Sequence, residues 1–247
     1  LREIPEIKNR GKEMSLKELR AELRGLADPR QAEVLSRFFK TGPGQYGEGD
    51  VFIGVTVPEQ RTIARRFVHA DMKDIATLLA SQVHEHRMTG LLILVEKFKK
   101  SDDLVRGKIV DFYMRRASRI NNWDLVDLSA PKITGPWFLS REKTPLYEFA
   151  RSGSLWKERI AIVSTYHFIK NGILEHTFAM ADILMEHEHD LIHKAVGWML
   201  REAGKSDRTA LEGFLNVRYR KMPRTMLRYA IEKFERRERD LYLSGKA

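Results

Sequence analysis

Four side chains spread along the chain combine residue types that could carry out chemistry together. Trp123 and Trp198 supply two indole faces, Asp127 supplies a carboxylate and Arg159 supplies a guanidinium. Indole rings attract cations through their faces, and a carboxylate stabilises developing positive charge electrostatically. The set therefore suits a reaction whose transition state is a cation.

A repeat along the chain predicts that these side chains share one surface. Segments with helical apolar spacing open at four residues separated by 36, 36 and 35 positions, namely Arg87, Trp123, Arg159 and Lys194. This is the repeat length of HEAT-like arrays. In this register Trp123 and Arg159 occupy the same place in successive copies. Asp127 and Trp198 lie four residues further on, which is the same helix face.

Helical spacing of apolar residues runs through most of the chain, and prolines bound the segments that show it. We therefore predict an all-α fold, a HEAT-like helical repeat α-solenoid with a concave basic face. Residues 1–13 are expected to be a flexible N-terminal tail or tag, because Ser15 and Glu18 form a capping box just after Met14. Residues 14–247 are expected to form a single domain. By pattern alone, the alternation over 50–57 favours a short strand.

Composition limits the classes of function. The chain has 44 Lys and Arg against 34 Asp and Glu, which leaves a formal charge of +10 and favours polyanionic partners. Thirteen basic and seven acidic residues in 201–247 place +6 of this charge in the last fifth of the chain. It contains no cysteine, and no apolar run long enough to span a bilayer. We expect a cytoplasmic protein that binds neither membranes nor a cofactor.

Several segments resemble one family in the same order along the chain. They are FIGV at 52–55, PEQR at 58–61, WDLVD at 123–127, LWKER at 155–159 and KAVGWMLRE at 194–202. Together, from about Ala27 to Phe234, they look like DNA alkylpurine glycosylases of the AlkD type. The resemblance implies a HEAT-like α-solenoid that cups duplex DNA and releases cationic purines such as 3-methyladenine and 7-methylguanine. It also implies that 50–57 is a connector between helices and not a strand.

The resemblance assigns roles by position. Asp127 matches the catalytic aspartate, Trp123 and Trp198 match two indoles that face the sugar, and Arg159 matches an arginine that meets the DNA backbone. An alkylated purine cation leaves without protonation, so the carboxylate would stabilise the deoxyribose cation and orient the attacking water. Further DNA contacts are expected from a set of flanking residues, Phe38, Arg87, Lys194 and Arg201. The implied partner is double-stranded DNA with alkylated purines, bound by a monomer.

The chain departs from the family pattern at three places. Asn122 stands where some members have a second tryptophan before the one matched by Trp123. Phe38 stands where a tyrosine can lie near the lesion, and the stretch 41–50 is longer than expected. These changes leave the four central residues intact, but they concern substrate range and the N-terminal DNA contacts.

Two other classes of function compete with the glycosylase. Helical repeat arrays often bind proteins or nucleic acid without chemistry, so a non-catalytic scaffold is the alternative. The histidines at 187, 189 and 193 include an i, i+4 pair that could bind a metal. They lack a third matched ligand, so we predict no metal site and a polar link between helices. His84 and His86 precede a helix and are expected to be solvated.

Overall fold

The computed structural model describes residues 15–247, so the predicted tail at 1–13 lies outside the described residues. The chain divides into two compact units, one ending at Lys100 and the other comprising Ser101–Ala247. Each unit is described by itself, and the expectation of one domain over 14–247 stays a prediction. The protein is all-α, as predicted: across 15–247 there is no strand, and one isolated bridge joins Val51 to Val83.

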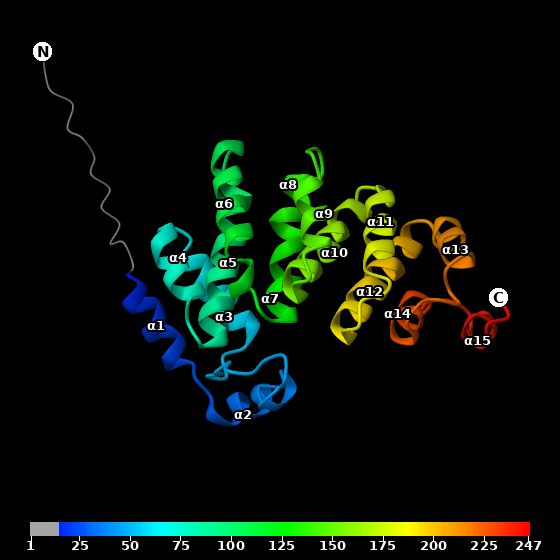
Figure 1. The fold of residues 1–247 in the computed structure, drawn as a ribbon. Helices are drawn as coiled ribbons and strands as arrows, with labels where there is room; N and C mark the ends of the chain where they lie inside the picture. The colour runs from blue at the N-terminus through cyan, green and yellow to red at the C-terminus, as the bar shows by residue number, and fades with distance from the viewer. Residues whose placement is uncertain (1–14) are drawn as a thin grey trace, which may run out of the picture. The chain divides into compact units, whose positions relative to one another are not determined.

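The first unit is a set of helices arranged around one long, buried helix. Its elements are α1 (Leu16–Gly25), α2 (Pro29–Phe38), α3 (Val57–Arg66), α4 (Met72–Leu79) and α5 (His84–Lys100). The predicted capping box at Ser15 and Glu18 starts α1. The longest, α5, packs against α3 and α4 and buries residues on nearly all its sides, as a helix enclosed by others must. Figure 1 shows α5 beside these two helices.

The segment between α2 and α3 is a connector, and the strand suggested by its alternation does not form. The start of α5 holds it in place: Glu85 accepts hydrogen bonds from the backbone N–H groups of Ile53 and Gly54 at 3.0 and 2.8 Å. Gly54 has φ +85°, and a Cβ there would lie 2.1 Å from the carbonyl oxygen of Asp28. The left-handed backbone at this glycine interrupts the extended run that a strand requires.

A buried ion pair fixes the same connector and overturns one expectation. The Arg87 guanidinium lies 2.7 Å from Asp50, and the His84 Nδ1 atom lies 3.3 Å from the same carboxylate. The prediction that His84 is solvated is wrong, because its ring stacks on Phe52 and is 2% exposed. Burial acts to raise the pKa of Asp50, but the adjacent His84 and Arg87 lower it overall.

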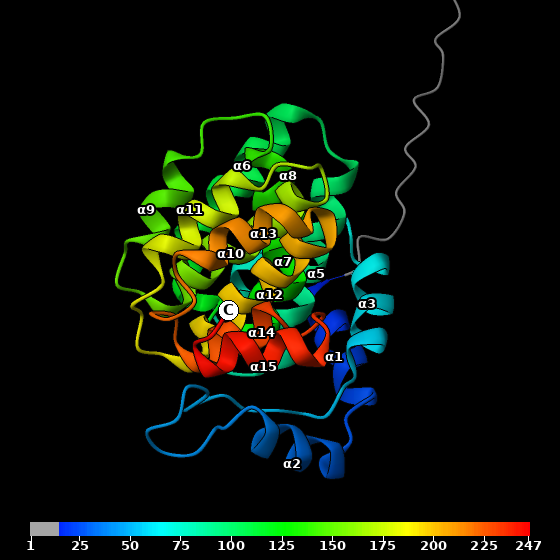
Figure 2. The same cartoon turned by 90° about the vertical axis from the view of Figure 1, so that its right-hand side faces the viewer.

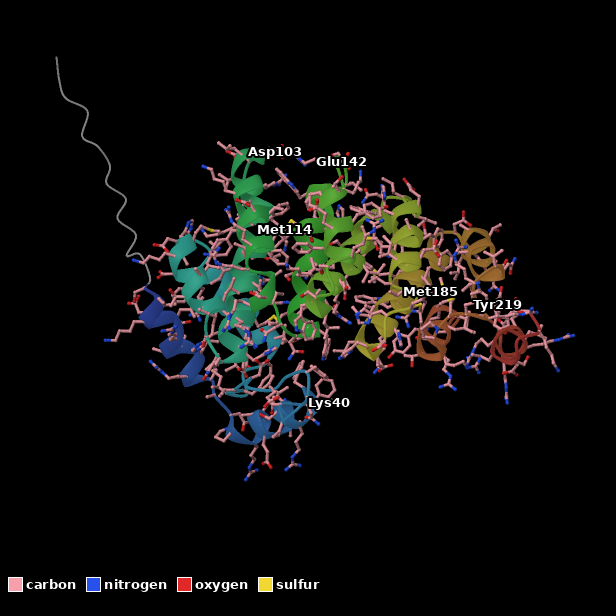
Figure 3. All side chains as sticks on the ribbon, viewed as in Figure 1. Lys40, Asp103, Met114, Glu142, Met185 and Tyr219 are labelled. Atoms are coloured by element: carbon pink, nitrogen blue, oxygen red, sulfur yellow. The ribbon has the colours of Figure 1, made fainter. Side chains whose placement is uncertain are left out.

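The second unit contains the remaining helices. They are α6 (Asp103–Arg115), α7 (Trp123–Ser129), α8 (Thr134–Phe138), α9 (Thr144–Ala150), α10 (Leu155–Ile169), α11 (Glu175–Ile183), α12 (Asp190–Ser206), α13 (Arg208–Asn216), α14 (Arg224–Ala230) and α15 (Arg236–Ser244). The start of α6 is tied to the turn before α9 by an ion pair between Asp103 and Arg141. Figure 3 shows Asp103 and Glu142 at the same end of this unit. No helix among residues 15–247 is long and apolar enough to cross a membrane.

Helices α10, α12 and α14 of the second unit lie side by side and run in the same direction (Figure 1). Arg159 and then Tyr166 of α10 meet Leu191 and then Trp198 of α12, so residue numbers rise together along both helices. The same order joins α12 to α14, where Asp190 bonds to Thr225 and Gly197, further along, packs against the Met226 carbonyl. Parallel neighbours place corresponding residues in a row across successive helices.

Candidate active site

A bidentate ion pair joins α7 to α10 at the centre of the second unit. Arg159 donates from Nε to Oδ1 of Asp127 at 2.9 Å and from Nη2 to Oδ2 at 2.8 Å. The Asp127 side chain is 16% exposed and the Arg159 side chain 6%, so most of the pair is withdrawn from water. Two parallel charge-assisted bonds fix the plane of the carboxylate as well as its position.

A third helix completes the fixation of Arg159. Its Nη1 atom donates to the Leu191 carbonyl oxygen, at the start of α12, at 2.6 Å. Asp127 and Arg159 are each the fifth residue of their helix, whereas Trp123 is the first residue of α7. The predicted equivalence of Trp123 and Arg159 is therefore wrong. α7 starts at Trp123, where Asn122 caps it, and the pair meets at a separation of 32 residues.

The groups around Asp127 shift its pKa in opposite directions. Burial raises the pKa of Asp127, and the nearby Asp124 adds to this shift, whereas Arg159 opposes it by charge and hydrogen bonds. The Asp127 carboxylate also acts on the buried phenol of Tyr113. Burial raises the pKa of Tyr113, and the negative charge of Asp127 raises it further. The phenol hydroxyl is 2.8 Å from the Ser129 hydroxyl, which ties α6 to α7 beneath the carboxylate.

One tryptophan lies on α7, which carries Asp127, and the other lies on α12, which contacts Arg159. Trp123 opens α7, one helical turn before Asp127, and it is half-buried. Trp198 lies on α12, is also half-buried, and its ring centroid is 6.0 Å from that of Tyr166. Tyr166 and Trp198 are 32 residues apart, as are Asp127 and Arg159. A repeat of 32 residues would therefore have identified Tyr166 from sequence as the neighbour of Trp198.

The residues expected to contact DNA differ in their partners and in how far they are exposed. Lys194 pairs with Asp190 one helical turn earlier at 2.7 Å, and Arg201 pairs with Glu232 in the turn after α14. In the first unit, Phe38 ends α2 with 61% of its surface exposed, which suits a contact residue. Arg87 is 1% exposed. Its guanidinium contacts Asp50 and the carbonyls of Ser81 and Gln82, so we leave it out of the contact set.

No group of histidine and acidic side chains within residues 15–247 has the arrangement of a metal site. The histidines at 187, 189 and 193 are instead engaged with backbone groups in the link between α11 and α12.

Comparisons with known proteins agree with the fold and the family. The family model described as DNA alkylation repair enzyme matches residues 19–234. Among solved structures, the chain is similar to a predicted DNA alkylation repair enzyme from Enterococcus faecalis, with 15% sequence identity and a TM-score of 0.65. That alignment covers 85% of this chain and 97% of the other, and at this identity the likeness concerns the fold alone. No curated protein matches the chain. Because the family match spans most of its length, the chain belongs to the DNA alkylation repair enzyme family.

Proposed function

We propose that the protein is a DNA glycosylase that hydrolyses the N-glycosidic bond of cationic alkylated purines in duplex DNA. The observation that carries the proposal is the Asp127 carboxylate, which is mostly buried and held in one orientation by Arg159. A fixed carboxylate in a partly dehydrated setting stabilises a developing cation far better than one that is free in water.

The residues present fit the charge changes of this reaction. As the bond between C1′ and the purine nitrogen breaks, its electron pair goes to the base, which leaves neutral, and positive charge develops on the deoxyribose. Ionised Asp127 stabilises that charge, and the half-buried indoles of Trp123 and Trp198 each add about 0.5 to 2 kcal/mol through their ring faces. Water then adds to C1′, and its proton passes to Asp127 or to solvent.

Arg159 holds Asp127 in the free protein, in addition to any role at the DNA backbone. Three of the five guanidinium N–H groups are occupied, two by Asp127 and one by the Leu191 carbonyl. Two N–H groups remain for a phosphate, on a side chain that is 6% exposed in the free protein. In this proposal Arg159 aligns the catalytic carboxylate and meets the backbone of the damaged strand with the same side chain.

Further phosphate contacts are proposed for cations of α14 and its flanks. Lys221 and Arg228 are exposed, and within residues 15–247 neither lies at ion-pair distance from a carboxylate. Arg228 lies about one helical turn after Thr225 on α14, whereas Lys221 lies in the turn before this helix. Thr225 bonds to Asp190 at the start of α12. Figure 2 shows α14 beside α15. Figure 3 shows many nitrogen-tipped side chains projecting from the end of the unit near Tyr219.

The test of the function is release of base from methylated duplex DNA. We expect 7-methylguanine and 3-methyladenine to be released by the parent protein and not by Asp127→Asn, with duplex affinity nearly unchanged. Asp111→Asn is the matched control, because Asp111 forms an exposed ion pair with Arg115 on α6. Binding without release by the parent would favour a DNA-binding scaffold, and equal release by Asp127→Asn would remove Asp127 from the mechanism.

The binding surface is tested separately with undamaged duplex. The logarithm of affinity should fall with the logarithm of salt concentration by about 0.9 per neutralised phosphate, so Lys221→Gln with Arg228→Gln should reduce the slope by about 1.8. Lys108→Gln on α6 is the control, since Lys108 is exposed and unpaired within the described residues. An unchanged slope in the double variant would exclude these two cations from the contact surface.

A further inference from the structure

The link between α11 and α12 is held by two histidine rings that accept backbone hydrogen bonds. The Leu191 N–H donates to Nδ1 of His189 at 3.1 Å, which caps the start of α12. The His189 N–H in turn donates to Nδ1 of His187 at 2.9 Å. His193, one turn into α12, contacts the carbonyl oxygen of His187 through Nε2. Residues that suggested a metal site therefore form a chain of backbone contacts.

This chain returns to α10 at the residue next to Arg159. The Nε2 atom of His187 lies 2.9 Å from Oε2 of Glu158, a side chain that is 6% exposed. The other oxygen of Glu158 accepts from the Gly153 N–H at 2.9 Å. Because the Leu191 carbonyl accepts from Arg159, the contacts form a closed ring from Glu158 through both histidines to Leu191 and Arg159.

The ring of contacts requires that one named nitrogen of each histidine carries no proton. A nitrogen that accepts a backbone N–H carries no proton, so His187 and His189 both have Nδ1 unprotonated. Burial lowers the pKa of His189, and electrostatic coupling to His187, His193 and Arg159 acts in the same direction, whereas Asp190 opposes it. These groups act on His189, and the Glu158 carboxylate of α10 faces His187. Protonation at Nδ1 would set two donors against each other and open the cap.

We propose that Glu158, His187 and His189 are positioning residues for the catalytic carboxylate. They hold the first turn of α12 against α10, so that the Leu191 carbonyl fixes Arg159 and Arg159 fixes Asp127. The role in catalysis rests on the proposed glycosylase function, whereas the positioning is a property of the protein before DNA binds. All three act through Leu191 and Arg159.

Opening the ring is expected to slow base release and not to weaken duplex binding. Loss of the His189 cap frees the Leu191 backbone and with it one of the three anchors of Arg159. A misplacement of about 1 Å at a distance from the chemistry can cost about 10²-fold in rate, so we expect His189→Ala to slow release by about 10- to 100-fold. His189→Asn retains an oxygen that can accept the Leu191 N–H, because asparagine is a strong N-cap residue.

The experiment compares His189→Ala, His189→Asn and Glu188→Gln in the full chain. Glu188 is an exposed residue of the same link and serves as the control. Release of 7-methylguanine is measured in single turnover at saturating protein, with duplex affinity measured separately. The expected order is slow release by His189→Ala and parental release by the other two. As pH falls below 6.5, the parent should lose activity through His189, and this step should be absent from His189→Asn.

A readout that does not depend on catalysis separates this proposal from the proposed function. Carbon NMR of the Asp127 carboxyl reports its pKa directly, and a loosened Arg159 should raise this pKa in His189→Ala but not in His189→Asn. If the parent releases no base while this difference is observed, the glycosylase function fails and the positioning stands. An unchanged Asp127 pKa in His189→Ala, or equal slowing by the alanine and asparagine variants, would overturn the positioning.

Discussion

Removal of the Arg159 guanidinium offers a quantitative test of the ion pair. Arg159→Ala deletes two charge-assisted bonds to Asp127 and one bond to the Leu191 carbonyl, and it leaves a carboxylate that is 16% exposed without its counter-charge. Breaking a buried pair by removing one partner typically costs about 3 to 5 kcal/mol. We expect a loss of about 3 kcal/mol in the free energy of unfolding at pH 7, since part of Asp127 reaches water.

The pH dependence of this loss has a defined sign. A carboxyl group whose pKa is raised by folding binds more protons in the folded state, so its contribution to stability falls as pH rises through that pKa. Burial already raises the pKa of Asp127, and Arg159 is the main group that opposes the shift. Arg159→Ala should raise the pKa further, so the variant should lose less stability at pH 5 than at pH 7.

A double-mutant cycle isolates the pairwise energy. Urea unfolding of Arg159→Ala, Asp127→Asn and the double variant should give a coupling of about 1.5 to 3 kcal/mol. The exposed pair of Lys194 and Asp190, with side chains 41% and 54% exposed, is the control, and an exposed pair of this kind couples by about 0 to 1 kcal/mol. A coupling at Arg159 no larger than that of the control would refute the assignment of a mostly buried, fixed carboxylate.

Three further outcomes follow from the same geometry. Single-turnover release should fall as pH drops through the pKa of Asp127, which lies above its ordinary 3.8. The rates are corrected for spontaneous depurination. A fall in rate centred at or below pH 3.8 would contradict the burial of the carboxylate. Tyr166→Leu should slow release several-fold while Tyr166→Phe should not, because only the first removes the ring beside Trp198; equal rates would exclude a role for that ring. Gly197→Ala should cost about 1 to 3 kcal/mol in urea unfolding, since its Cβ would lie 2.5 Å from a backbone carbonyl of α14. Gly213→Ala, with open space around it, should not destabilise, and equal losses would argue against close packing of α12 on α14.

Helix positions followed from local signals in the sequence. Apolar spacing predicted the helices, and the capping box at Ser15 and Glu18 marked the start of α1 correctly. Capping depends on side chains within three residues of the helix start, so it can be recognised without tertiary information. The connector at 50–57 was ambiguous because alternation does not reveal whether a partner strand exists, and Gly54 there adopts a left-handed backbone.

The sequence by itself determined the all-α class, the start of α1 and the residue types available for chemistry, because propensity, capping and periodicity act over a few residues. It also grouped Asp127 with Arg159, but as a carboxylate and a separate phosphate contact. Only the tertiary structure decided that the two form one bidentate pair, that Arg87 is buried against Asp50, and that the histidine link closes on Glu158. Polar side chains about 30 or more residues apart meet only through helix packing, and their burial depends on neighbours that no local pattern specifies.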